Sequence, residues 1–238
     1  MSKEYSLQGT KIIMRRLFKY DIDEISACFK TCDQLFFNPH TIDFINNVFL
    51  HGEFWGAFSD NQIIACSYLF PFESSFFKNE KRYGQLCDFL PDPCDYLYMG
   101  YVGFHCKNQL PPDKAYILNN IYQAFLNVAE MQAFRRNLKK IIHCIPLKIP
   151  CDISPVFSNG FRLIKIRGLE KLVVHYVFVK SIYKDKKIPD TKLKGESLNV
   201  ALSNTKTLSG FLENGYCARE ISKDSNEIVL SLFPLVAD

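Results

Sequence analysis

The 238-residue sequence has no long apolar segment, no C-x-x-C pair and only a small charge imbalance. No apolar run approaches the roughly 20 residues that a membrane-spanning helix needs. The opening segment MSKEYSLQGTKIIMRRL is polar and charged, so we expect no secretory signal. The net charge of +4 is too small and too scattered for a nucleic-acid surface. We therefore expect neither a membrane nor a nucleic acid as a partner.

The cysteines and histidines form no pattern that is typical of a metal site or a disulfide framework. There are 9 cysteines, an odd number, and most lie inside apolar runs such as IIACSYLF and IIHCIPL. In such runs a free thiol packs as a small hydrophobic side chain. The 5 histidines are scattered, and none has a cysteine or histidine at the spacing of a closed zinc site. We expect no metal, and a reducing, cytoplasmic location.

Apolar and aromatic residues, in contrast, are abundant. They include 21 Phe and 12 Tyr, and apolar residues make up 47% of the chain, enough for a substantial core. Hydrophobic periodicity predicts the order β-α-α-β-β-loop-β-α-β-α-β-β, followed by β-α-β-β. This is an α/β chain, of the α+β kind, with a mixed sheet. Because several strands are joined as hairpins, we do not expect a doubly wound nucleotide-binding sheet.

Turn and cap residues predict several element boundaries. Asp21 is placed to cap a helix over 21–36. Ser59-Asp60-Asn61 predicts the turn of a hairpin, and Gly160 a left-handed residue that ends a short helix. Arg167-Gly168 predicts a second hairpin turn. The other predicted helices are 41–52, 113–140 and 203–214, and the other predicted strands include 11–18, 95–106, 141–147, 171–180 and 227–233.

A similar motif occurs twice in the chain, as FSNGF at 157–161 and as FLENGY at 211–216, and each copy is followed by β-like segments. The polar segment 181–197 is the best linker candidate. We predict a main domain over 1–183 and a βαββ extension over 184–238. The extension cannot bury its own apolar face, so it must dock on the main sheet or on a partner chain. Duplication and chance similarity both explain the repeated ending.

Four segments carry a resemblance to a known family. They are IIMRRLFKYDIDEISACF (12–29), FWGAFSDNQIIACSYLF (54–70), YMGYVGF (98–104) and SPVFSNGF (154–161). In this order they resemble the GNAT acyltransferase family over residues 11–180. The tail adds Asn204, eleven residues before Gly215, which is similar to the family's strand-Asn-helix-Gly-aromatic ending.

The resemblance implies an N-acyltransferase that moves an acyl group from acetyl-CoA, another acyl-CoA or a carrier-bound thioester to a small amine. The alternative is a catalytically inert GNAT-like domain that serves ligand binding or assembly. Glycines inside a strand favour a bulge or the close approach of a ligand. We therefore predict that Gly100, Tyr101, Val102 and Gly103 contact the pantetheine arm of the donor.

The turn after this strand departs from the family pattern. In the family, glycines let backbone N–H groups at a helix N-terminus hold the pyrophosphate. Here the turn reads CKNQLPPDKAY, with no glycine and with two prolines that lack an N–H. Side chains of Lys107, Asn108 and Lys114 are the predicted replacements, and an inert site is the alternative.

Three residues are candidates for proton transfer. An acidic residue at the start of the fourth strand often acts as the base in the family, which points to Asp95. His105 at the end of this strand is a second candidate base or acceptor-binding group. The family also uses a tyrosine near the end of its last helix, where this chain has none, and Tyr176 in the last strand is the candidate retained. Each also has a purely structural reading.

Two partner proteins are considered as well. A homodimer is compatible with a docking extension. An acyl carrier protein would need a basic docking face, for which the candidates are Arg135, Arg136, Lys139 and Lys140.

Overall fold

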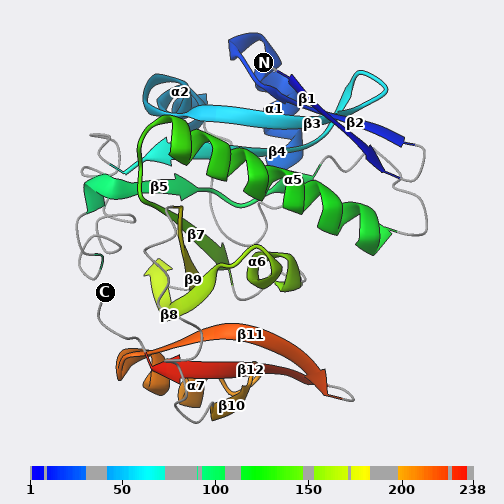
Figure 1. Ribbon diagram of the computed structural model, residues 1–238. Helices are drawn as coiled ribbons and strands as arrows, with labels where there is room; N and C mark the ends of the chain where they lie inside the picture. The colour runs from blue at the N-terminus through cyan, green and yellow to red at the C-terminus, as the bar shows by residue number, and fades with distance from the viewer. Residues whose placement is uncertain are drawn as a thin grey trace.

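The computed structural model describes residues 2–7, 10–30, 42–72, 90, 93–104, 114–146, 153–170, 173–182, 198–224 and 227–234. These residues form a mixed sheet with the strand order β1-β2-β3-β4-β5-β7-β9-β8-β11-β12-β10, and β6 pairs with β4 (Figure 1). β5 and β7 run parallel, whereas the neighbouring pairs on either side are antiparallel. The predicted α/β chain with a mixed sheet is confirmed.

The strands are β1 (Ser2–Leu7), β2 (Thr10–Arg16), β3 (Glu53–Ser59), β4 (Gln62–Pro71), β5 (Tyr96–Met99), β6 (Gly103–Phe104), β7 (Lys140–Pro146), β8 (Arg162–Glu170), β9 (Val173–Ser181), β10 (Leu198–Ala201), β11 (Tyr216–Asp224) and β12 (Glu227–Pro234). The helices are α1 (Ile22–Lys30), α2 (Ile42–His51), α5 (Lys114–Arg135), α6 (Ser154–Ser158) and α7 (Thr205–Glu213), with short 3-10 turns η1 (Lys19–Asp21) and η2 (Pro93–Asp95).

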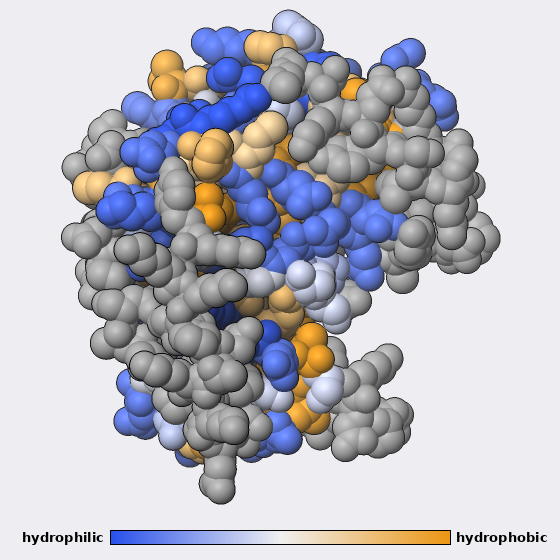
Figure 2. Space-filling view, in the orientation of Figure 1, coloured by the Kyte–Doolittle hydropathy of each residue, from blue (hydrophilic) through white to orange (hydrophobic). Residues whose placement is uncertain are grey.

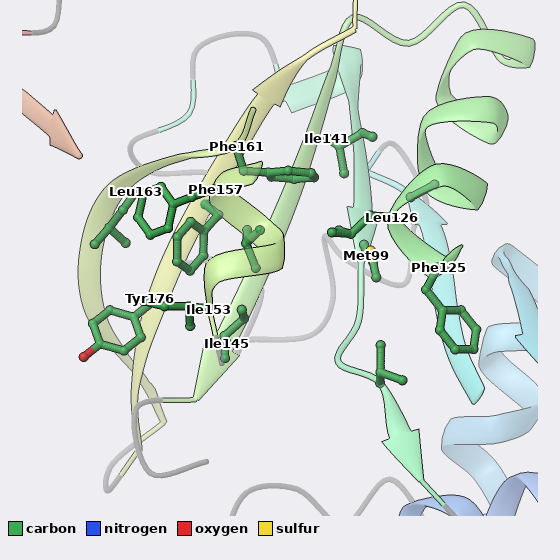
Figure 3. Packing of buried hydrophobic residues seen from close by; sticks show 14 of the residues in the cluster. Met99, Phe125, Leu126, Ile141, Ile145, Ile153, Phe157, Phe161, Leu163 and Tyr176 are labelled. Carbon is green, nitrogen blue, oxygen red and sulfur yellow. The ribbon is translucent and has the colours of Figure 1, made fainter. Parts of the chain in front are cut away.

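The sheet separates two apolar clusters. Side chains alternate along each strand, so Leu97 and Met99 of β5 face one cluster and Tyr96 and Tyr98 face the other. Helices α5, α6 and α7 contribute to the first cluster, part of which is drawn in Figure 3, and α1 and α2 to the second. Both helical layers are needed because the central strands are buried on both faces.

Two turns predicted from residue type are confirmed, because the residues concerned have positive φ angles. Asp60 and Asn61 have φ of +48° and +64°, which gives the tight turn predicted between β3 and β4. Gly160 has φ of +77° directly after α6, as predicted. The helix predicted to reach Lys140 instead ends at Arg135, and Asn137 adopts φ of +56°.

Two predictions at the strand and cap level were wrong, and one strand was not predicted. Arg167 and Gly168 lie inside β8, which continues to Glu170, so the hairpin turns later than predicted. Strand β1, paired along β2, was not predicted. Asp21 does not cap α1 but accepts the Phe18 N–H at 2.8 Å, and it is held by a two-bonded pair with Arg15.

The C-terminal segment adds strands to the far side of the sheet. β11 pairs with β8 through Ala218 and Leu163, and β12 and β10 follow outward. Asn204 caps α7, because its side chain accepts the Thr207 N–H at 3.2 Å. The predicted boundary at 183/184 lies outside the described residues. Among the described helices, none has both the length and the apolarity to cross a membrane.

Candidate functional site

The sheet opens beside the parallel pair of strands. β5 and β7 pair over four rungs, of which the last joins Met99 to His143. Beyond Met99 the chain stays with β4, because the Gly100 N–H donates to the Tyr68 carbonyl at 2.8 Å and β6 then pairs with β4. β7 instead continues to Pro146 along β9. The described strands therefore diverge after the Met99–His143 rung, and we call this place the split.

A bulge lies on the β5 side of the split. Residues 100–102 lie opposite only residues 67–68 of β4, so the strand carries one extra residue there. The Ser67 hydroxyl donates to the Gly100 carbonyl at 3.1 Å and fixes the start of the bulge. The bulge predicted from the glycines is thus present.

The two glycines are required by packing on the α1 face of the sheet. A Cβ on Gly100 would lie 2.2 Å from Cζ of Tyr68, and a Cβ on Gly103 would lie 2.7 Å from the ring of Phe29. Tyr101 packs its ring edge-on against Phe29 at 5.3 Å. These contacts explain both glycines without a ligand, so the glycines by themselves do not identify a binding site.

His143 occupies the last rung before the split. Its ring is fully buried, Nδ1 lies 2.9 Å from the Met99 carbonyl, and Nε2 contacts the hydroxyl of Tyr122 on α5. A carbonyl can only accept, so Nδ1 carries the proton and Nε2 accepts from the Tyr122 O–H. Burial lowers the pKa of His143 to about 4, against the opposing effect of the Met99 bond. The imidazole is therefore neutral at pH 7.

The hydrogen bond to His143 determines whether the Tyr122 hydroxyl can donate to or accept from a further partner. Tyr122 is half-buried, in contrast to His143. Because its proton is committed to Nε2 of His143, the phenol oxygen presents lone pairs to any further partner. The pair thus places a hydrogen-bond acceptor on the α5 face of the sheet, beside the split.

Helices α5 and α6 cover this face and are joined by side-chain amides. Gln123 of α5 and Asn159 at the end of α6 exchange reciprocal hydrogen bonds. Asn159 also donates to the Pro155 carbonyl at 2.6 Å, which ties it to its own helix. Figure 3 shows Phe157 of α6 and Phe161 on the β8 side, and Leu126 of α5 on the β5 side.

The surface is hollowed next to these helices. Figure 2 shows a notch on the right of the molecule. By comparison with Figure 1, α5 lies above it, α6 at its inner end and the β11–β12 hairpin below it. β5 and β7 diverge toward this side of the molecule (Figure 1). The notch and the split together make this end of the sheet the candidate site.

The predicted donor-binding residues are only partly described. Gly100, Tyr101, Val102 and Gly103 form the bulge and its continuation into β6, and all four are buried. Lys114 is the first residue of α5. The remaining predicted residues lie outside the described part of the chain: His105, Lys107 and Asn108.

The predicted catalytic residues Asp95 and Tyr176 do not meet at the split. Asp95 lies before β5, and its carboxylate pairs with Lys139 at 2.7 Å. At ~3.3 Å per strand residue, Met99 is about 13 Å further along. Tyr176 pairs with Ile145 across β9 and β7, and its hydroxyl points away from α6 in Figure 3. Tyr122 and His143 are the polar residues that the structure places there instead.

The basic residues predicted as a carrier-docking face make contacts within the chain. Arg136 donates to the buried carboxylate of Glu53 at 3.2 Å, and Lys139 pairs with Asp95. Lys140 lies over the Tyr96 ring, 5.6 Å from its centroid. These contacts hold the end of α5 and the start of β7 against the sheet, so they account for the basic residues without a carrier protein.

Cys144 follows His143 on the diverging part of β7. Burial raises the pKa of its thiol well above the ordinary value, so the thiol is protonated at neutral pH. Burial therefore disfavours a thiolate nucleophile at this position. In the described residues no three His, Cys, Asp or Glu side chains gather into a group that could hold a metal ion.

No protein-family model and no curated protein sequence matches the chain. Solved structures do match it. A putative acetyltransferase from Salmonella typhimurium, YncA, solved with acetyl-CoA, is 11% identical, covers 75% of this chain and 98% of its own, and has a TM-score of 0.51. The GNAT domain of S. lividans PAT is 14% identical, with coverage of 76% and 96% and a TM-score of 0.50.

A third similar structure is AAC(6')-Ib in complex with paromomycin and acetyl-CoA. It is 9% identical, covers 71% of this chain and 93% of its own, and has a TM-score of 0.51. At such identities the likeness concerns the fold, and function has to be argued from the site. The chain has the fold of the GNAT N-acetyltransferases.

Proposed function

We propose that the protein is an N-acyltransferase that transfers an acyl group from an acyl-CoA to a small amine. The observation that carries this proposal is the split after Met99 and His143, next to a bulge on β5 and β6. An extended pantetheine arm pairs with strand backbone in the manner of an added strand, and diverging strands leave backbone for such pairing. The fold neighbours solved with acetyl-CoA support the same donor.

The reaction needs no covalent enzyme intermediate. The amine nitrogen attacks the thioester carbonyl, negative charge develops on the carbonyl oxygen, and the C–S bond then breaks with the electron pair leaving on sulfur. Backbone N–H groups beside the bulge are the candidate donors to the developing oxyanion. The amine loses one proton and the leaving thiolate gains one, so the chain is unchanged after each turnover.

Tyr122 is the candidate for orienting the amine. Its oxygen accepts hydrogen bonds because His143 holds its proton, so it suits an N–H of the acceptor amine. His143 acts through Tyr122 and is a positioning residue. We expect Tyr122→Phe to lower kcat/KM about 10-fold to 100-fold, in line with the loss of one positioned hydrogen bond to a reacting group.

The earlier candidates Asp95, His105 and Tyr176 remain hypotheses for proton transfer. For Asp95 the geometry leads to a specific expectation. Its carboxylate is partly exposed, paired with Lys139 and far along the strand from the split. We expect Asp95→Asn to change kcat/KM less than about 3-fold, because a surface ion pair contributes ~1 kcal/mol or less. Steady-state kinetics on both variants compares Asp95 directly with Tyr122, and a loss greater for Asp95→Asn would restore Asp95 as the base.

One feature favours the inert alternative. The sequence before α5 contains Pro111 and Pro112, which have no N–H to offer to a pyrophosphate. A GNAT-like domain that had lost its donor site would tolerate these prolines. This alternative makes a different prediction for ligand binding, so a single experiment separates the two.

The test is thermal unfolding with CoA, acetyl-CoA and longer acyl-CoAs, followed by a thiol-release assay with an amine panel. A ligand at 100 times its Kd adds about 2.7 kcal/mol of stability, which corresponds to a rise in Tm of about 5 to 10 °C for a chain of this size. Adenosine 3′,5′-bisphosphate serves as the control for nucleotide binding alone. A Tm shift with amine-dependent thiol release supports the enzyme; a shift without release supports an inert binding domain. No shift with any CoA compound would contradict a free acyl-CoA donor.

A further inference from the structure

The repeated ending noted in the sequence corresponds to two structural units with the same order of elements. The first unit, built from residues 140–181, has the chain order β7-α6-β8-β9, and its strands lie in the sheet in the order β7-β9-β8. The second unit, built from residues 198–234, has the chain order β10-α7-β11-β12, and its strands lie in the order β10-β12-β11. In each, a strand leads into a helix and then into an antiparallel hairpin, whose second strand pairs back onto the first. The units therefore share topology as well as composition.

Their strand registers also agree. Pro146 pairs with His175 in the first unit, and Ala201 pairs with Val229 in the second. The first members of these pairs differ by 55 positions (146 to 201) and the second members by 54 (175 to 229). The same offsets relate the other three pairs of the β10–β12 ladder to pairs of the β7–β9 ladder. Chance similarity of short βαββ segments does not fix the register of a whole unit.

One irregularity coincides too. The β8–β9 ladder shifts register between Leu163 and Lys165, and the β11–β12 ladder shifts between Ala218 and Glu220, again 55 positions later. The β8–β9 ladder shifts a second time between Gly168 and Glu170, which the described pairs of the β11–β12 ladder do not repeat. The residues between helix and hairpin follow the same offset, since Gly160 has φ of +77° and Gly215 has φ of +84°. A β-bulge is a specific feature that is retained within related structures, so its recurrence indicates a duplication.

The two units meet through equivalent residues. β8 and β11 run antiparallel, and Leu163 pairs with Ala218, its own counterpart in the second unit. Helix α6 contacts β11, and α7 contacts β8, so each helix reaches across to the other unit. Leu208 of α7 and Val156 of α6 lie in the same apolar cluster on one face of the sheet. A residue that pairs with its own counterpart lies on a local two-fold axis, as in an isologous dimer interface.

We propose that the second unit is an internal duplicate of the first and occupies the β8 edge in place of the same unit from another chain. The edge of β8 is self-complementary, and the intact chain is a monomer at this edge because its own duplicate covers it. An uncovered edge strand is open to pairing with another chain, and the duplicate removes that exposure. This inference does not depend on the proposed acyl transfer.

The test releases the second unit within the full chain. The double variant Ala218→Asp, Leu208→Asp places two carboxylates where the units meet, since both side chains are fully buried. Lys206→Asp, on the exposed side of α7, is the matched control. In sedimentation experiments we expect a monomer for the wild type and for the control, and a concentration-dependent dimer for the double variant. Hydrogen exchange of the β11 amides reports release.

A cross-link then tests the geometry. In the released background, Leu163→Cys oxidised with diamide is expected to join position 163 of one chain to position 163 of another, because β8 meets β8 across the two-fold axis. Lys165→Cys, two residues along the same strand, is expected not to join itself. Proteolysis and mass spectrometry distinguish this bond from bonds to the native cysteines.

Three results would overturn the proposal. They are a double variant that stays monomeric with exposed β11 amides, a dimer in which position 165 rather than 163 joins itself, and β11 amides that remain protected despite both carboxylates. If the double variant does not fold, Leu208→Ser replaces it. This change removes the apolar contact of α7 with β8 without adding a charge, and the same three results apply.

Discussion

Gly100→Ala is expected to lower the free energy of unfolding by about 3 kcal/mol. A Cβ at this position would lie 2.2 to 2.5 Å from three ring carbons of Tyr68, closer than carbon atoms can approach. Tyr68 cannot turn aside, because its ring is buried among neighbouring rings. Those neighbours are Phe29, Phe44, Phe54, Phe70, Tyr98 and Tyr101. Overpacking of a core site of this kind costs ~1 to 3 kcal/mol, and the rigid surroundings place this one at the upper end.

The measurement is urea or thermal unfolding, where the loss corresponds to a fall in Tm of about 6 to 12 °C. Gly210→Ala is the matched control: Gly210 lies inside α7 and a Cβ there meets nothing within 4 Å. This change should raise stability by roughly 0.5 to 1 kcal/mol, because alanine favours the helix. A Gly100→Ala variant as stable as the wild type would mean that Tyr68 moves freely, and the account of the bulge given above would then be wrong.

The bulge shows how far the sequence could lead. Gly100 and Gly103 inside an apolar strand predicted a bulge, and a bulge is there. The sequence could not distinguish a glycine that admits a ligand from one that admits an aromatic ring. That choice depends on Tyr68 and Phe29, which lie 32 and 74 positions away in the chain (68 to 100 and 29 to 103). The glycines of the strand thus predicted the bulge, whereas the reason why glycine is needed there depends on tertiary packing.

The same difference explains which site residues were missed. Asp60, Asn61 and Gly160 act through their own backbone conformation, and their roles followed from residue type and position. Tyr122 and His143 meet only because α5 lies across β7, and neither carries a motif. A histidine inside the apolar segment IIHCIPL does not reveal that its ring makes two hydrogen bonds, as His143 does.

The repeated ending illustrates a further limit. Asn-Gly followed by an aromatic residue suggested a duplication, but short turn motifs recur in unrelated chains. What separates duplication from chance is strand register, and register depends on pairing partners that a sequence does not display. The equivalence of the bulges after Leu163 and Ala218 became visible only in the ladders.

His143 is expected to make the fold less stable as the pH falls from about 6.5 to about 4. Burial lowers the pKa of the folded chain's His143 to about 4, whereas in the unfolded chain it has its ordinary value of 6.5. Between these values the unfolded chain binds a proton that the folded chain does not, so stability rises with pH across this window and is constant in this respect above it. A difference of about 2.5 pKa units corresponds to a loss of roughly 3 kcal/mol at the acid end.

His143→Gln tests this effect, since glutamine keeps a donor and an acceptor but does not titrate. At pH 7 the variant should be less stable than the wild type by about 1 to 2 kcal/mol, because the two buried hydrogen bonds are less well aligned. By pH 4.5 the stability of the wild type relative to the variant should have fallen by about 2 to 3 kcal/mol, so that the difference shrinks or reverses. Urea unfolding at each pH measures this change. Tyr122→Phe is the control: burial, not the hydroxyl, causes the shift, so this variant should keep the wild-type dependence on pH. A His143→Gln difference that is the same at both pH values would show that His143 has the same pKa in the folded and the unfolded chain, which would contradict the effect of burial on this ring.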